Sequence, residues 1–164
     1  MSAVPEVSIR PLQNPEEASA CAELMATSEP WITLRGTYED GLKFLLDSTR
    51  EVHVALIENA VAGFILLNLR GPFKGYLQTI CVAPKWRNLG LGRKLIGFAE
   101  ARIFRESPNV FLCVSSFNTA AQRFYSRLGY IRVGELPDYV VNGHSEILMR
   151  KTLGPIADFL PRTS

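Results

Sequence analysis

The sequence is poor in the side chains that bind metal ions and form disulfides. It has three cysteines and two histidines in 164 residues, and Cys21, Cys81 and Cys113 are far apart, with no Cys-x-x-Cys pair. A structural zinc site usually has more closely spaced ligands, so we expect no metal. An odd number of cysteines is typical of a reducing compartment, and the first ten residues lack the apolar core of a secretion signal. We therefore expect a cytoplasmic protein.

Long apolar runs and a strong excess of one charge are also missing. The longest apolar stretch, residues 61–69, is interrupted by Gly63 and Asn68 and is much shorter than the roughly 20 residues of a membrane-spanning helix. The net charge of +2 gives no support for a nucleic-acid or membrane partner. The length and the 47% hydrophobic content fit one domain over residues 1–164, with a core at about 7–153 and a tail at 154–164.

The remaining pattern alternates between segments typical of strands and of helices. Helices are predicted to begin at Asn14 and at Thr37 and to run over 90–104 and 118–128. Strands are predicted at 7–12, 51–58, 61–69, 76–82, 110–114, 130–136 and 146–153, with a turn at 59–60. The strand–helix–strand segment 76–114 predicts a parallel crossover, and the other strands predict an antiparallel meander. The expected fold is α/β, with a mixed, mostly antiparallel sheet and flanking helices.

One segment has the chemistry of an anion site. Pro84 ends a strand, and Gly90 and Gly92 then open a helix whose first N–H groups have no partner within the helix. These N–H groups and the helix dipole attract anions such as a diphosphate, and glycine lets the backbone approach it closely. Arg93 and Lys94 stand at the helix end that disfavours cations, which a bound polyanion would explain. The alternative is a surface turn with solvated charges. Neither a G-x-G-x-x-G fingerprint nor a Walker A loop is present.

Two motifs together resemble the GNAT acetyltransferase superfamily. Residues 87–92, Arg-Asn-Leu-Gly-Leu-Gly, match the family's Q/R-x-x-G-x-G/A signature for acetyl-coenzyme A (acetyl-CoA). Residues 118–130 match a second signature of Asn, Ala, Phe-Tyr and Leu-Gly-Tyr, in the family's order. The resemblance is strong over 76–130 and weak before residue 51. It implies a GNAT-like mixed sheet and transfer of an acetyl group from acetyl-CoA to an amine.

The resemblance also implies roles for individual residues. The acetyl and pantetheine groups would contact Ile80, Cys81, Val82 and Asn118, whereas the diphosphate would contact Arg87, Asn88, Leu89, Gly90, Leu91, Gly92 and Arg93. The N–H of Val82 would stabilise the oxyanion, with that of Cys81 as an alternative. Tyr125 would lie near the sulfur and act as general acid, because its ordinary pKa of about 10 keeps the phenol protonated. An aromatic residue on a helix is otherwise more often part of the core.

The general base is less clear from the sequence. Ribosomal-protein N-terminal acetyltransferases of the family carry glutamate where this chain has Cys113, and Gln78 cannot take a proton. The late segment 138–146 offers Asp138, His144 and Glu146, of which His144 has the most suitable ordinary pKa. An exposed turn histidine and a water chain to solvent are the alternatives.

The acceptor is expected between the early helices and this late segment. Trp31, Arg35, Tyr38 and Tyr139 have the size and polarity of a ligand wall. Trp31 and Tyr38 could equally anchor a helix corner, and Arg35 could bind a substrate carboxylate or a surface acid. The leading hypothesis is a small-molecule primary amine as acceptor; a peptide amine, either a protein N-terminus or a lysine, is the runner-up. A non-catalytic acyl-CoA-binding module is the alternative outside enzymes, and a homodimer is possible.

Overall fold

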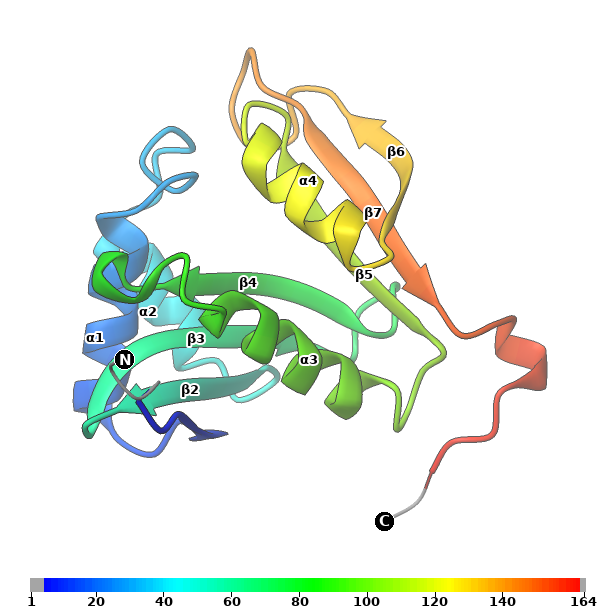
Figure 1. Cartoon of the computed structure of the whole chain (residues 1–164). Coiled ribbons are helices and arrows are strands. Elements are labelled where there is room, and N and C mark those ends of the chain that lie inside the picture. Colours follow the sequence, from blue (N-terminus) through cyan, green and yellow to red (C-terminus); the bar gives the residue numbers. More distant parts are fainter. Residues whose placement is uncertain (1–4, 163–164) are drawn as a thin grey trace.

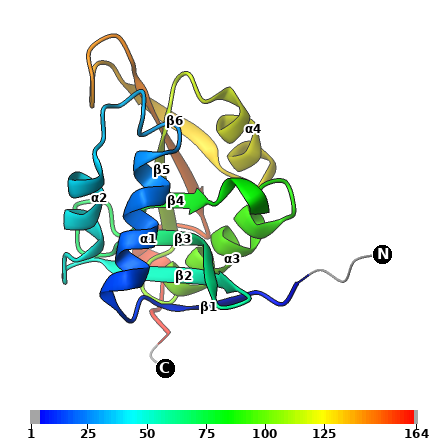
Figure 2. The same cartoon turned by 90° about the vertical axis from the view of Figure 1, so that its left-hand side faces the viewer.

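A computed structural model describes residues 5–162 as a seven-stranded sheet with helices on both faces (Figures 1 and 2). The strands are β1 (Ser8–Pro11), β2 (Glu51–Ile57), β3 (Ala60–Asn68), β4 (Tyr76–Val82), β5 (Asn109–Ser115), β6 (Ile131–Leu136) and β7 (Glu146–Thr152). The helices are α1 (Pro15–Ala26), α2 (Tyr38–Leu45), α3 (Leu91–Ile103) and α4 (Thr119–Arg127), with short 3-10 helices at Pro84–Trp86 and Ile156–Asp158.

The sheet has the order β1-β2-β3-β4-β5-β7-β6. The β4–β5 pair is parallel and the other five pairs are antiparallel, which confirms the predicted fold class. The predicted hairpin turn lies one residue earlier than expected. Glu58 and Asn59 both have positive φ, as a two-residue turn between twisted strands requires, so Ala60 already belongs to β3.

Local sequence signals explain where the helices begin. The Asn14 side chain accepts a hydrogen bond from the Glu17 N–H at the start of α1, and Thr37 and Asp40 form a reciprocal capping box at the start of α2. Asn118 caps α4 in the same way through Ala121. These side chains satisfy N–H groups that a helix end leaves without partners, so three of the four helix starts are set by the local sequence.

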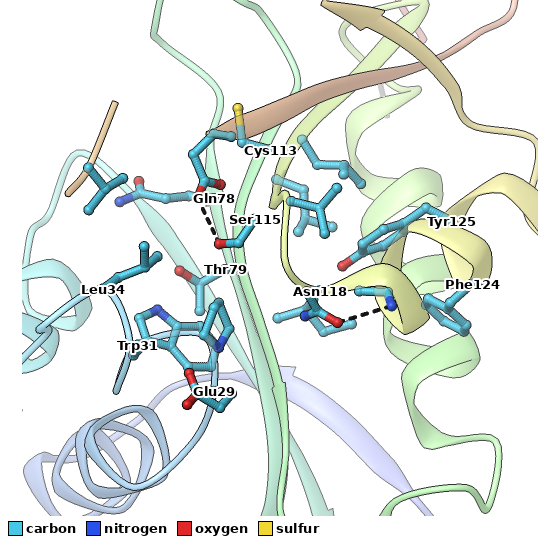
Figure 3. A pocket seen from close by; sticks show the side chains of 18 of the residues that line it. Glu29, Trp31, Leu34, Gln78, Thr79, Cys113, Ser115, Asn118, Phe124 and Tyr125 are labelled. Atoms are coloured by element: carbon cyan, nitrogen blue, oxygen red, sulfur yellow. Dashed lines mark hydrogen bonds between the residues drawn. The ribbon is translucent and has the colours of Figure 1, made fainter. Parts of the chain in front are cut away.

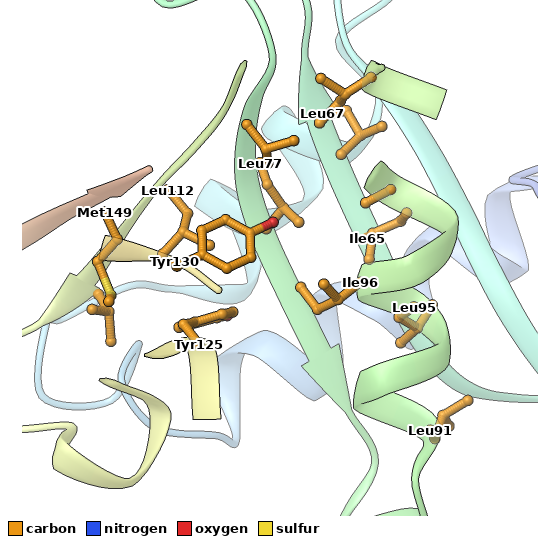
Figure 4. Close-up of a cluster of buried hydrophobic side chains, with 14 of the residues drawn as sticks. Ile65, Leu67, Leu77, Leu91, Leu95, Ile96, Leu112, Tyr125, Tyr130 and Met149 are labelled. Carbon is orange, nitrogen blue, oxygen red and sulfur yellow. The ribbon is translucent and has the colours of Figure 1, made fainter. Parts of the chain in front are cut away.

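The core consists of two apolar layers on opposite faces of the sheet. In β3, Ile65 and Leu67 face α3 and α4, whereas Phe64 and Leu66 face α1 and α2. Because β3 is buried on both faces, its sequence is a continuous apolar run. Figure 4 shows the larger layer, in which the α3 side chains Leu91, Leu95 and Ile96 pack toward the sheet. Among the described residues, no helix combines the length and apolar character that crossing a membrane requires.

Gly75, just before β4, lies where strands β1–β4 of the sheet meet strands β5–β7. Its φ of +91° is left-handed, and a Cβ there would lie 2.1 Å from the carbonyl oxygen of Asn109. The Gly75 carbonyl accepts a hydrogen bond of 3.0 Å from the Phe111 N–H. Only glycine allows this conformation and this close approach together.

We therefore expect Gly75→Ala to lower the free energy of unfolding by about 3 kcal/mol or more, because it adds both overpacking and backbone strain. Gly97→Ala is the matched control: Gly97 lies within α3, and a Cβ added there would meet no neighbouring side chain or strand within 4 Å. That change should stabilise the protein by roughly 1 kcal/mol. Denaturant unfolding of the two variants measures both effects. Equal stabilities would contradict the role assigned to the close contact between Gly75 and Asn109.

Candidate functional site

The candidate site lies where β4 and β5 separate. Their register contains one pair among the described residues, Tyr76 with Phe111, and beyond it the two strands diverge (Figure 1). A cavity of about 460 Å³ lies in this opening. Its lining includes Ile80 and Val82 from β4, Cys113 and Ser115 from β5, Asn118, Phe124 and Tyr125 from the α4 region, and Glu146 from β7 (Figure 3).

The backbone of β4 offers free hydrogen-bonding groups to this cavity. The Ala83 N–H donates to Ala62 on β3, and groups along an antiparallel strand point alternately toward and away from the partner strand. The N–H groups of Ile80 and Val82 therefore point toward the opening. The Val82 carbonyl, on the same side, accepts a hydrogen bond of 2.9 Å from Nε of Arg87. Val82 can thus donate to an oxyanion in the opening.

Cys81 occupies the opposite position in this alternation. Its backbone groups point toward β3, and its thiol is buried against the end of α1, with Sγ 3.9 Å from the Leu24 carbonyl oxygen and 4.0 Å from Oγ of Ser28. Cys81 does not line the cavity. The expected contact of Cys81 with the cofactor, and its N–H as an alternative oxyanion donor, therefore have no geometric support.

The start of α3 presents uncapped N–H groups. Gly90 is the N-cap, with φ +83° and no side-chain cap, and Asn88 before it also has positive φ. The Gly90 carbonyl accepts from Lys94, so the N–H groups of Leu91, Gly92 and Arg93 precede the first helical hydrogen bond. The space beside the Gly90 Cα, where a Cβ would stand, is open. This end of α3 is therefore accessible to an anion, as the glycine motif predicts.

The side chains around these N–H groups differ in whether they can contact a bound anion. Gly92 and Arg87 line the cavity, but the Arg87 guanidinium is engaged with Val82 and, at 3.2 Å, with Ser28. Leu89 and Arg93 are exposed, whereas the Leu91 side chain is part of the core. Leu91 can therefore contact a diphosphate only through its backbone.

Tyr125 reaches the cavity from α4. The residue is 7% exposed, and its ring packs edge-on against Phe124 and Tyr130. Figure 3 shows its hydroxyl directed toward the cavity, where no protein group among residues 5–162 hydrogen-bonds to it. Burial raises the pKa of this phenol, so it carries its proton at neutral pH. The core and the catalytic interpretations of Tyr125 are therefore compatible: the ring is core and the hydroxyl faces the cavity.

Asn118 both caps a helix and lines the cavity. Its Oδ1 accepts a hydrogen bond of 3.1 Å from the Ala121 N–H and so caps α4. Because Oδ1 is the acceptor, Nδ2 remains as a donor for a ligand in the cavity.

The late segment contributes Glu146 to the cavity, whereas His144 lies outside it. The His144 ring packs edge-on against Phe117, with 4.9 Å between centroids, and does not line the cavity. Glu146 is 6% exposed, lines the cavity and accepts a hydrogen bond of 2.7 Å from the Ser115 hydroxyl (Figure 3). Burial raises the pKa of this carboxyl, opposed by the Ser115 hydrogen bond. The position expected for His144 is thus held by a carboxyl two residues later.

A second cavity of about 550 Å³ adjoins the first on the side of α2. The two cavities share seven lining residues: Trp31, Leu34, Tyr76, Gln78, Thr79, Tyr139 and Val140. Arg35 lines the second cavity only. Tyr38 lines neither cavity and, like Trp31, packs against the smaller core layer. Of the predicted acceptor residues, Trp31, Arg35 and Tyr139 thus lie together, and Tyr38 is a helix anchor.

Comparison with known proteins gives a family for this arrangement. Residues 18–130 match the acetyltransferase (GNAT) family. The chain belongs to the GNAT acetyltransferase family. An uncharacterized protein of Mycobacterium leprae is 35% identical over 91 residues, which are 55% of this chain and 25% of that protein. An uncharacterized N-acetyltransferase of Methanocaldococcus jannaschii is 34% identical over 101 residues, 60% of this chain and 64% of the relative. The matches thus span only part of these relatives.

Solved structures of GNAT proteins share the fold. A putative acetyltransferase of the family from Desulfovibrio desulfuricans superimposes with a TM-score of 0.76 at 18% identity, covering 91% of this chain and 100% of that one. An aminoglycoside 6'-N-acetyltransferase complexed with coenzyme A gives 0.73 at 20% identity and coverage of 90% and 98%. The ribosomal-protein-S18-alanine N-acetyltransferase of Escherichia coli gives 0.72 at 18% identity and coverage of 94% and 99%. At these identities the likeness concerns the fold alone.

The residues of this GNAT chain fit a coenzyme A thioester. The uncapped start of α3 suits a diphosphate, and the free edge of β4 suits the amide groups of a pantetheine arm. Among residues 5–162 no group of three or more His, Cys, Asp or Glu side chains could hold a metal ion.

Acetyl-CoA at 100 times its dissociation constant should therefore stabilise the protein by about 2.7 kcal/mol, or roughly 5–10 °C in melting temperature. Gly92→Trp should abolish this shift, because the indole would enter the cavity that Gly92 lines. Gly97→Trp, on the same helix but in open space, should keep it. Differential scanning fluorimetry with and without acetyl-CoA makes the comparison. An unchanged shift in Gly92→Trp would contradict the phosphate assignment.

Proposed function

We propose that this GNAT protein transfers the acetyl group of acetyl-CoA to the primary amine of a small molecule by direct attack. The observation that supports this most is the cavity between β4 and β5. It brings together a free backbone N–H at Val82, the hydroxyl of Tyr125 and the carboxyl of Glu146. An acyl transfer to an amine needs an oxyanion donor, an acid for the leaving sulfur and a base for the amine.

Binding would depend mainly on the backbone. The N–H groups at the start of α3 would hold the diphosphate, and the outward-facing groups of Ile80 and Val82 would bind the pantetheine arm as a further strand would. Nδ2 of Asn118 would donate to the same arm. Bound acetyl-CoA supplies an acetyl group that its thioester activates toward an amine.

Three groups of the chain would then move protons and stabilise charge. Glu146 accepts a proton from the substrate ammonium, and the freed lone pair forms the new carbon–nitrogen bond. The Val82 N–H donates to the carbonyl oxygen as negative charge gathers there. Tyr125 gives its proton to the sulfur as the carbon–sulfur bond breaks, and the second proton released by the nitrogen returns to the phenol through solvent. We assign the base to Glu146 rather than His144 because only Glu146 lines the cavity.

A protein N-terminus or a lysine is the second acceptor class. The likeness to the E. coli ribosomal-protein N-acetyltransferase supports it at the level of fold. The family resemblance implies that enzymes of that class carry glutamate at the position of Cys113, and the lack of this glutamate favours the small-molecule amine. Measuring thiol release from acetyl-CoA with a panel of amines and peptides distinguishes the two acceptor classes. If acetyl-CoA binds saturably but no acceptor causes thiol release, the protein is a non-catalytic acyl-CoA-binding module.

Tyr125→Phe should lower kcat about 100-fold, a typical loss for one positioned general acid, and leave the dissociation constant for acetyl-CoA nearly unchanged. The phenyl ring keeps the packing against Phe124 and Tyr130, so the melting temperature should hold. Steady-state kinetics and a binding titration measure the two parameters. A kcat equal to that of the wild type would remove Tyr125 from the chemistry.

Glu146→Gln should lower kcat about 100-fold and remove the acid limb of its pH profile. In the wild type, kcat should fall as the pH drops through the pKa of Glu146, because only the carboxylate accepts a proton. Burial raises that pKa, so the limb should lie above the ordinary range of a glutamate. His144→Gln is the control and should retain the limb. Loss of the limb in His144→Gln alone would move the base to the histidine.

A further inference from the structure

The second cavity, which we call the acceptor cavity, has few charged groups on its wall. They are Arg35, Asp40 and Lys43, and all three are exposed. Within residues 5–162, neither Arg35 nor Lys43 forms an ion pair or a side-chain hydrogen bond. Arg35 also has a left-handed backbone, with φ +60°, which is uncommon outside glycine and is often found at functional positions. Its guanidinium is therefore free to bind a ligand.

One oxygen of the single carboxylate on this wall is already engaged. Oδ2 of Asp40 accepts hydrogen bonds from the Thr37 N–H at 3.2 Å and the Thr37 hydroxyl at 2.8 Å, in the capping box of α2. These bonds, with the nearby charge of Lys43 as a smaller contribution, lower the pKa of Asp40. The carboxylate thus stabilises the start of a helix, and Lys43 is partly balanced by it. Arg35 is the charge on the wall that no protein group compensates.

Gln78 adds a neutral hydrogen-bond donor, and its contact with Arg50 determines which way its amide N–H groups point. Nε of Arg50 donates to Oε1 of Gln78 at 2.8 Å, and Arg50 is itself held by an ion pair with Asp47. Because arginine has no acceptor, the Gln78 oxygen must face Arg50. Nε2 is then directed away from Arg50, and Gln78 lines both cavities. Its two N–H groups can donate to a substrate where the cavities meet.

The free polar groups of the acceptor cavity are therefore mainly donors. We propose, on the basis of the function proposed above, that the acceptor is a small amine that also carries a carboxylate, such as an amino acid. Arg35 and the Gln78 amide bind the carboxylate, Trp31 and Tyr139 flank the body of the molecule, and the amine points toward Glu146. A polycation such as an aminoglycoside needs acceptors instead and meets uncompensated positive charge at Arg35.

The proposal can be tested with matched substrates that differ only in the carboxylate. Amino acids and their carboxamides are compared as acceptors, together with kanamycin and spermidine, by thiol release at saturating acetyl-CoA. The carboxylates should have a kcat/KM at least 10-fold higher than their carboxamides. The amine of a carboxamide is less basic and so more often neutral, which would favour the carboxamide if charge recognition were absent.

Substitution of Arg35 tests the residue itself. Arg35→Ala should reduce kcat/KM for the carboxylates about 10-fold or more, mainly through KM, while leaving the carboxamides almost unaffected. Arg35→Lys should restore part of the loss. Arg127→Ala is the control, since Arg127 is an exposed arginine at the end of α4 that lines neither cavity, and it should behave as wild type. The melting temperature with acetyl-CoA verifies that each variant folds.

The outcomes separate the inference from the proposed function. If kanamycin or spermidine is acetylated faster than the amino acids, the carboxylate assignment is wrong, although the protein is still an acetyltransferase. The same holds if Arg35→Ala affects an amino acid and its carboxamide equally. If acetyl-CoA binds but none of these amines or the test peptides releases thiol, the proposed function fails and the inference falls with it.

Discussion

The site depends on two parallel strands that pair at one end and separate at the other. Past Tyr76 and Phe111, neither the outward-facing groups of β4 nor those of β5 have a partner in the other strand. A backbone N–H or carbonyl left without a hydrogen bond costs free energy where water is excluded, so such an edge favours a ligand with amide and carbonyl groups of its own. The cavity is thus a place where the sheet is incomplete, and its affinity for an extended ligand follows from that incompleteness.

An opening of this kind would close if the strands were free to approach each other. Packing on both sides opposes this. Tyr125 and Tyr130 join the α3 side chains in the larger core layer and so connect α4 with the first half of the sheet. Ser115 and Glu146, paired between β5 and β7, place a buried polar bond at the wide end of the cavity. Helix α4, which lines the opening on one side, also carries the proposed acid, so Tyr125 serves both the fold and the proposed chemistry.

Much of this fold could be predicted from the sequence because its signals are local. Caps at Asn14, Thr37 and Asn118 mark helix starts, and the apolar run of β3 indicates burial on both faces. The separation of β4 from β5 could not be derived in the same way, because the pairing of distant strands depends on packing throughout the sheet. The resemblance of 87–92 and 118–130 to a known family supplied what the local patterns do not contain.

The difference between local signals and long-range packing also explains which site residues could be predicted from the sequence. The glycines of the α3 start were found because their conformation is a local property, and both Gly90 and Asn88 have positive φ. Glu146 was passed over for His144 because the ordinary pKa of histidine is nearer neutrality. Which of two residues in one segment faces a cavity depends on where β7 begins, and Glu146 is its first residue. Trp31 and Tyr38 were indistinguishable in sequence, since both are aromatic residues near a predicted helix start. Both pack against the smaller core layer, and only Trp31 also lines the cavities.

Cys113 bears on whether the acetyl group passes through the protein. Cys113 is one of the residues that line the cavity, and a route through an acetylated protein would use its thiol as the nucleophile. The thiolate is the reactive form, and burial raises the pKa of this thiol, with the nearby Glu146 adding to the effect; a hydrogen bond with Tyr76 opposes it only in part. Burial, with Glu146 as a smaller contribution, thus disfavours the thiolate of Cys113. A disfavoured thiolate at Cys113 is consistent with the proposed direct transfer from thioester to amine.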